Sequence, residues 1–326
     1  MKTIASILII LVTLIIVSAQ KELDALRAEG NDALQNLDYE VARKRCQKMI
    51  DIAPDHPAGA QCYASSLWLQ QLNEAWELKA TLYSTSAYTN EKPKADRRRT
   101  EEFRNWIRRA KLLSEARLRR NSRDVEALYF LGAAEGLEAA FAGAVERKFM
   151  AALRAGSNSV DHHREVLKLS PQFRDAELTI GLQNYIVGSL PLPAKMLAGT
   201  MGVRGSKKRG LETLERVASE GQWARDVARV LLVDLYKREK RWSDAVNIAR
   251  QLSEKYPRNY LFKLQTADAL ASQIVTLRKA KAPSSAEEKE LTSIFASLSR
   301  DKTLDRPTID LIQHRWTIAR QQLSER

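Results

Sequence analysis

The chain has 326 residues, a formal net charge of +13, 44% hydrophobic and 29% charged residues, which excludes a disordered or fibrous protein. Its 13 glycines and 9 prolines are too few for the many turns of an all-β sandwich or barrel. Its 2 cysteines exclude a disulfide scaffold and a zinc site built from thiolates alone.

Residues 1–19 have the pattern of a secretory signal peptide. Lys2 gives a positive start, residues 4–17 form an almost unbroken aliphatic run, and Ser18-Ala19 supplies the small residues that signal peptidase requires. The run is shorter than the roughly 20 apolar residues that span a bilayer, which favours cleavage over a retained anchor. We therefore expect an exported, periplasmic protein, with secretion or an N-terminal membrane anchor as the alternatives.

Export would place the two cysteines, Cys46 and Cys62, in an oxidising compartment where a disulfide can form. They fall on two successive predicted helices. A bridge requires their Cα atoms to lie within roughly 7 Å of each other. The sequence leaves two interpretations open: a disulfide, or two small apolar residues of the core.

From residue 20 onward, apolar residues recur almost everywhere with the period of an α-helix. Leu23 and Leu26 fall on one side of a first helix, Cys46 and Met49 mark a second, and the two prolines within residues 53–57 end it. We find no β-branched run with a period of two. The pattern predicts helices in pairs joined by short polar turns, which is the organisation of a helical repeat array.

Two of these predicted pairs repeat one residue spacing. The prolines that end them are 203 residues apart, close to six periods of about 34 residues. Small residues occupy the positions where two helices of a pair cross, and proline follows the second helix. The positions that both copies share are Ala33, Ala42 and Pro54 in the first and Tyr236, Ala245 and Pro257 in the second. Leu26 and Gly30 in the first copy and Leu232 in the second occupy further positions of the same unit.

This spacing resembles that of the tetratricopeptide repeat family, and the resemblance implies a superhelix of stacked antiparallel helix pairs. The middle of the chain also resembles an extended-unit subgroup of exported bacterial tetratricopeptide proteins, a likeness that carries no known activity. That likeness rests on Asn184-Tyr185, Leu190-Pro191-Leu192-Pro193 and Arg209-Gly210-Leu211.

We therefore predict an all-α fold, an α-solenoid of tetratricopeptide-like hairpins over residues 20–281, followed by a helical tail over residues 282–326. Ser284 or Ser285 is the expected N-cap of the first tail helix, near 286–299, and a second helix follows near 307–324. The tail either packs on the last hairpin or stays mobile. The five expected hairpins are 23–54, 57–121, 124–172, 174–221 and 223–258, with 259–280 as a cap.

The segment 92–123 is strongly basic, with thirteen Lys or Arg residues against four acidic ones. An apolar stripe through Phe103 and Ile107 predicts a helix whose other faces carry the charge. Such a face either keeps the protein soluble or binds anionic lipid, an anionic cell-wall polymer or an acidic partner. Nucleic acid is not an expected partner, because the chain has an export pattern and no nucleic-acid motif. The candidate anionic-surface contacts are Arg97, Arg98, Arg104, Arg108, Arg109, Arg119 and Arg120.

Two short motifs resemble chemical sites but have simpler interpretations. The glycine-rich segment 199–208 lacks the residue order and preceding strand of a phosphate loop, so we expect a turn with Ser206 as N-cap. His162 and His163 are adjacent on a predicted helix and point about 100° apart, so we expect polar surface residues rather than ligands of one metal ion. No assembled nucleophile or general base is recognisable. We expect no enzymatic activity and no cofactor.

Stacked hairpins curve, and the first helix of each pair lines the concave side. We therefore expect a non-catalytic scaffold or adaptor of the cell envelope that binds a partner peptide or helix in this groove. Most of the six tryptophans should lie in the core, with one or two on the groove as recognition anchors. The alternative is a peripheral envelope protein that docks on anionic lipid or cell-wall polymer through the basic helix face.

Overall fold

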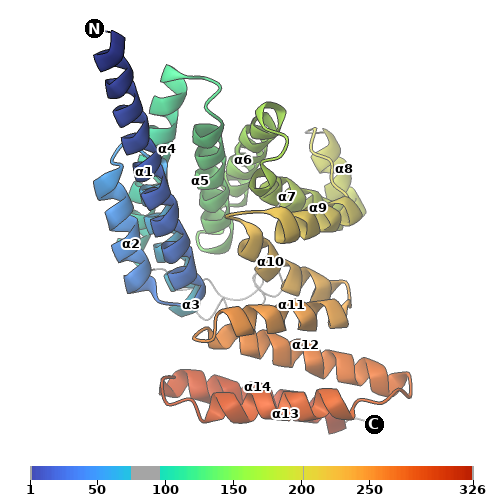
Figure 1. Cartoon of the computed structure of the whole chain (residues 1–326). Coiled ribbons are helices and arrows are strands. Elements are labelled where there is room, and N and C mark those ends of the chain that lie inside the picture. Colours follow the sequence, from blue (N-terminus) through green and yellow to red (C-terminus); the bar gives the residue numbers. More distant parts are fainter. Residues whose placement is uncertain (1, 75–95, 201, 325–326) are drawn as a thin grey trace.

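The computed structural model describes residues 2–74, 96–200 and 202–324, with side chains for all of these except 2–17, 197 and 322 (Figure 1). These residues form fourteen α-helices and one 3-10 turn, and none of them lies in a strand. The predicted all-α fold is confirmed.

The helices pack mainly as sequential antiparallel pairs, as the repeat pattern predicts. The five pairs correspond to the five predicted hairpins. They are α1 (Lys2–Gln35) with α2 (Tyr39–Ile52), α3 (Pro57–Glu74) with α4 (Arg97–Arg120), α5 (Val125–Ala144) with α6 (Phe149–Leu169), α7 (Glu177–Ser189) with α9 (Lys207–Glu220), and α10 (Arg225–Arg238) with α11 (Trp242–Lys255).

The remaining elements interrupt or end the stack. The 3-10 turn η2 (Arg174–Ala176) precedes α7, and the short helix α8 (Leu192–Thr200) lies between α7 and α9. The chain then continues through α12 (Tyr260–Lys279), α13 (Ser285–Ser299) and α14 (Arg306–Ser324). The unit that contains α7 and α9 is therefore longer than a simple helix pair.

Several helices begin where a side chain accepts a hydrogen bond from an otherwise unpaired backbone N–H group. Ser206 caps α9 in this way, as expected for the glycine-rich segment. Further caps are Asp96 on Arg99 N, Asp124 on Ala127 N and Asn259 on Leu261 N. The first tail helix begins after Ser284, one of the two predicted caps, whose hydroxyl donates to Glu288 at 2.5 Å.

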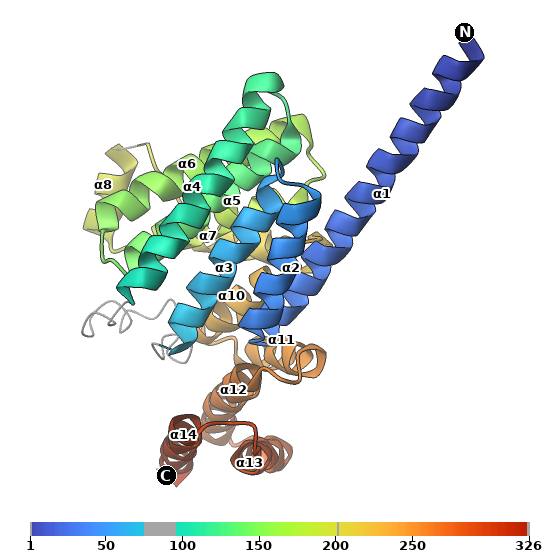
Figure 2. The same cartoon turned by 90° about the vertical axis from the view of Figure 1, so that its left-hand side faces the viewer.

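The C-terminal tail packs on the array. Leu291 and Phe295 of α13 and Ile312 of α14 are buried in the same cluster as Leu270 of α12. Figure 2 shows α13 and α14 beside α12 at the end of the stack. Of the two interpretations that the sequence left open for this tail, the packed one holds.

The two ends of the array meet. The guanidinium of Arg258 pairs with Asp38 in the turn between α1 and α2, and Asn259 Nδ2 donates to the carbonyl of Gln35 at 2.6 Å. Leu37 of the same turn packs against the large apolar cluster of the C-terminal half. Figure 1 shows the lower end of the first pair next to the start of α12. The turn of the first pair therefore contacts the segment that leads into α12.

A disulfide joins Cys46 of α2 to Cys62 of α3, with their Cα atoms 5.5 Å apart. It links the first hairpin to the second. The predicted signal segment, residues 1–19, lies almost wholly outside the residues whose side chains are described. Among the helices that can be judged, none has both the length and the apolar character needed to cross a membrane.

Candidate binding groove

Three neighbouring cavities of about 290, 380 and 340 Å³ follow the inner side of the array. The central cavity is lined by the first helix of every pair, α1, α3, α5, α7 and α10, as the solenoid geometry predicts. Trp68 lines all three cavities, which therefore adjoin one another at this side chain. We refer to the three together as the inner groove.

Arg27 of α1 projects into the centre of the inner groove among aromatic rings. Its guanidinium carbon lies 4.1 Å from the ring centre of Trp223, 4.8 Å from Phe130 and 5.7 Å from Tyr129. Stacking of this kind stabilises the cation through the ring faces and leaves the N–H edge for a hydrogen-bond acceptor. Within the described residues Arg27 forms no ion pair, and burial lowers its pKa. The groove thus contains a cation that forms no close ion pair among the described residues, although Glu126 and Asp175 attract it.

Asp175 holds the ring of Trp223 in place beside Arg27. Its Oδ1 accepts hydrogen bonds from the backbone N–H groups of Gln222, Trp223 and Ala224 at 2.9, 2.8 and 2.7 Å. Three such donors at the start of α10 stabilise the buried carboxylate. The segment that carries Trp223 is thereby fixed to η2.

His163 of α6 closes the wall behind Tyr129. Its Nε2 donates to the Tyr129 carbonyl at 3.1 Å, and its Nδ1 accepts from the Thr179 hydroxyl at 2.6 Å. Burial lowers the pKa of His163 to about 4, so the ring is neutral near pH 7. The expectation of a surface residue is wrong for this histidine, which is 2% exposed. Because adjacent residues on an α-helix point in different directions, the inward face of α6 includes His163 although its neighbours in the sequence are polar and more exposed.

The adjacent His162 has different neighbours. Its Nδ1 lies 2.8 Å from Glu135, and this hydrogen bond raises its pKa. The two histidines therefore point to different partners, as their helical spacing predicts. Across the residues that the structure describes, no group of three or more His, Cys, Asp or Glu side chains is placed to hold a metal ion.

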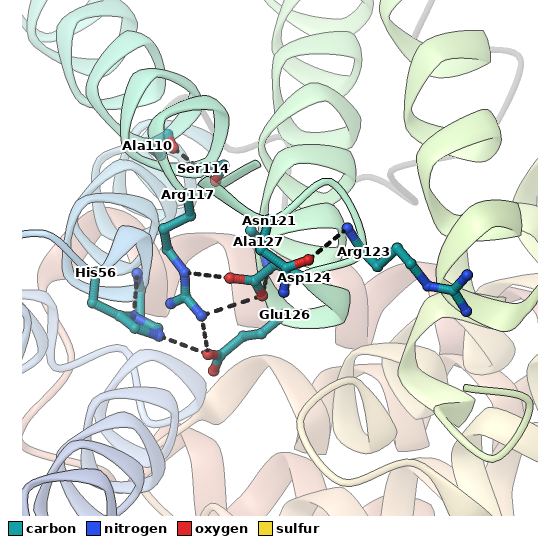
Figure 3. A network of polar contacts seen from close by, with 10 residues as sticks. His56, Ala110, Ser114, Arg117, Asn121, Arg123, Asp124, Glu126 and Ala127 are labelled. Carbon is teal, nitrogen blue, oxygen red and sulfur yellow. Dashed lines mark hydrogen bonds and ion pairs between the residues drawn. The ribbon is translucent and has the colours of Figure 1, made fainter. Parts of the chain in front are cut away.

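A polar network ties the second and third pairs together near the groove (Figure 3). Arg117 of α4 forms two hydrogen bonds with Asp124, at 2.9 and 3.2 Å, and one with Glu126 at 3.0 Å. His56 Nε2 lies 3.0 Å from Glu126. Although burial acts to raise it, the hydrogen bonds from His56 and Arg117 lower the pKa of Glu126 to about 2. The network fixes the start of α5, which carries the Tyr129 and Phe130 rings.

The predicted arginines of α4 lie elsewhere, and none of them lines the inner groove. Some are matched by neighbours: Arg97 pairs with Glu101 at 3.3 Å, Arg104 pairs with Glu146, and Arg109 stacks on Trp106 at 5.3 Å. All seven predicted contacts are exposed: Arg97, Arg98, Arg104, Arg108, Arg109, Arg119 and Arg120.

Sequence reasoning placed one or two tryptophans on the groove, and Trp68 and Trp223 occupy that position. It missed Arg27, because the rings around this side chain come from residues more than 100 positions away. The only local signal for Arg27 is its place on the first helix of a pair. Trp76 lies outside the described residues.

No protein-family model matches the chain, and no curated protein matches it in sequence. What the structure defines is an all-helical protein of stacked sequential helix pairs, with a cavity lined by the first helix of each pair.

Proposed function

We propose that the protein is a non-catalytic, tetratricopeptide-like scaffold of the cell envelope that binds an extended segment of a partner protein in the inner groove. The observation that carries the proposal is the central cavity of the inner groove, which is lined by the first helix of every pair and by Trp68, Trp223 and Arg27. Aromatic rings and arginine are the side chains that most often dominate the energy of protein interfaces.

The groove favours an extended segment over a helix. Each of its three cavities measures between about 290 and 380 Å³. An α-helix with its side chains is about 10–12 Å across and would need the ends of the array to separate. An extended chain inserts only alternate side chains. An acidic group on that segment would satisfy Arg27.

The tetratricopeptide assignment and the location are supported by separate observations. Pro54 and Pro257 each lie two residues after the end of a helix, α2 and α11, as the repeat requires. The Cys46–Cys62 disulfide and the N-terminal signal pattern support export, since disulfides persist in oxidising compartments.

The test is a pull-down from envelope extract with a matched pair of variants. Val227 is 40% exposed and lines the groove, whereas Val41 is 44% exposed and lies on α2 away from it. We expect Val227→Glu to lose a partner that the wild type and Val41→Glu both retain, because a carboxylate in the groove excludes an apolar side chain. Equal recovery by all three proteins, or no partner for any, would contradict the proposal.

The alternative is docking through the α4 arginines, and their exposure is the observation that favours it. Replacing Arg97, Arg98, Arg108 and Arg109 with Ser tests it. Unchanged co-sedimentation of this variant with anionic cell-wall material or vesicles removes the alternative.

A further inference from the structure

Exposed apolar side chains concentrate on one part of the described surface. Ten large apolar side chains are more than a third exposed, and six of them lie on the first half of α6, the end of α7 and α8. Single exposed apolar residues are ordinary, but a cluster marks an interaction site. The six are Phe149, Met150, Leu153, Ile186, Leu192 and Met196, with exposed fractions of 56, 72, 39, 43, 71 and 66%.

The same segments carry only positive charge. Residues 147–160 contain three basic residues and no acid, and residues 178–211 contain five basic residues and no acid. Lys207 and Lys208 pair with acids outside this run, Glu239 and Glu212. Arg154, Arg204 and Arg209 are exposed and form no ion pair with any residue that the structure describes. The surface therefore combines apolar anchors with unneutralised guanidinium groups.

The local geometry presents these side chains outward. Leu153 and Ile186 line the mouth of the 340 Å³ cavity between α5, α6 and α7. The α8 helix contacts α7 and is held by a hydrogen bond from Lys195 Nζ to the Gly188 carbonyl at 2.9 Å. Figure 1 shows α8 at the edge of the molecule, next to α7 and away from α12 to α14. Leu192 and Met196 on this helix are exposed because α8 has so few protein neighbours.

We propose that this α6–α8 surface docks on a bilayer that contains anionic phospholipid. Met150, Leu153, Leu192 and Met196 enter the headgroup–acyl boundary, and Arg154, Arg204 and Arg209 contact lipid phosphates. Interfacial binding requires both parts, apolar burial and attraction to anionic lipid. Among the described residues, α4 carries charge but has a single large exposed apolar side chain, Leu112. It therefore lacks the apolar surface that interfacial binding requires. This surface shares Leu153 with the lining of the 340 Å³ cavity, but it uses none of Trp68, Trp223 and Arg27, on which the proposed scaffold function rests.

The test is hydrogen–deuterium exchange of the full chain on vesicles of phosphatidylcholine with and without phosphatidylglycerol. Comparing the two lipid mixtures removes any contribution from the apolar N-terminal segment, which would insert into both. We expect slower exchange in residues 147–160 and 186–204 on the anionic vesicles only. The Leu192→Ser/Met196→Ser double variant should lose this protection. Leu112→Ser, a change at the 54% exposed leucine of α4, should retain it.

Three outcomes would overturn the proposal: protection confined to α4, equal protection on neutral vesicles, or protection in the double variant equal to that of the wild type. Protection that appears only when envelope protein is added would assign the surface to a protein partner instead. Thermal melting of each variant checks that its fold is intact. Because the readout is local, a failure here leaves the groove experiment with Val227 unaffected.

Discussion

The two adjacent histidines of α6 respond in opposite directions to their surroundings. Burial lowers the pKa of His163 to about 4, whereas the hydrogen bond with Glu135 raises the pKa of His162. In an unfolded chain both would titrate near 6.5. Between about pH 6.5 and pH 4, His163 therefore binds a proton in the unfolded chain but not in the folded protein. The free energy of unfolding falls as the pH falls through this range. His162 has the opposite effect on stability. The stabilisation by its protonated form is lost as the pH rises through its raised pKa.

We predict that His163→Gln reduces the loss of stability on acidification. From about pH 7 to about pH 5, the wild-type free energy of unfolding should fall by about 2 kcal/mol more than that of the variant. Urea unfolding at the two pH values measures this difference. His314→Gln, at an exposed histidine of α14, is the control and should keep the wild-type pH dependence. Parallel curves for all three proteins would show that His163 is not the titrating group.

The contact between α5 and α6 depends on small residues at the crossing. A Cβ atom on Gly132 would lie 2.7 Å from the ring of His163 and 3.1 Å from the Ser159 carbonyl. One on Gly136 would lie 3.1 Å from Ser159 Oγ. The two axes are therefore as close as side chains allow, and this places Tyr129 and His163 in one wall of the inner groove.

We predict that Gly132→Ala destabilises the protein by about 1–3 kcal/mol, because the added methyl group separates the two helices. Gly199→Ala in α8 is the matched change, since a Cβ there meets nothing within 4 Å. It should be neutral or slightly stabilising, as alanine is the better helix former. Chemical denaturation of both variants provides the comparison. A Gly132→Ala protein as stable as the wild type would mean that the crossing can widen without cost.

How far the sequence predicts these features depends on the range of the contacts involved. Helical periodicity, prolines and caps act over a few residues, so the five hairpins and the cap at Ser206 were predictable. The burial of His163 was not, because its neighbours Tyr129 and Thr179 belong to other helices. The aromatic surroundings of Arg27 are harder still to predict from the sequence, since Trp223 is 196 residues away in the chain. The groove required the packing of all five pairs.

At the scale of the whole molecule, the contact between the two ends rests on few interactions. The Arg258–Asp38 pair is largely solvent-exposed, with side-chain exposures of 64 and 32%, and pairs of this kind contribute at most about 1 kcal/mol. The hydrogen bond from Asn259 and the packing of Leu37 add to it. The contact between the two ends therefore rests on one partly exposed ion pair, one hydrogen bond and the packing of Leu37.

We predict that Asp38→Arg increases the radius of gyration, because two arginines then face each other across this contact. Small-angle X-ray scattering at low salt measures the change. The exchanged pair, Asp38→Arg with Arg258→Asp, should restore the wild-type value because the attraction returns with its polarity reversed. If the single and exchanged variants scatter identically, the ion pair does not hold the ends together.

Contact between the first turn and α12 also bears on how such a molecule can change during evolution. Open repeat proteins lengthen or shorten by whole units, because each unit touches only its neighbours. Here a duplicated or deleted hairpin would carry Asn259 away from Gln35 and break this contact. Variation in this lineage should therefore appear as longer or shorter loops and inserted helices such as α8, while the number of hairpins stays constant.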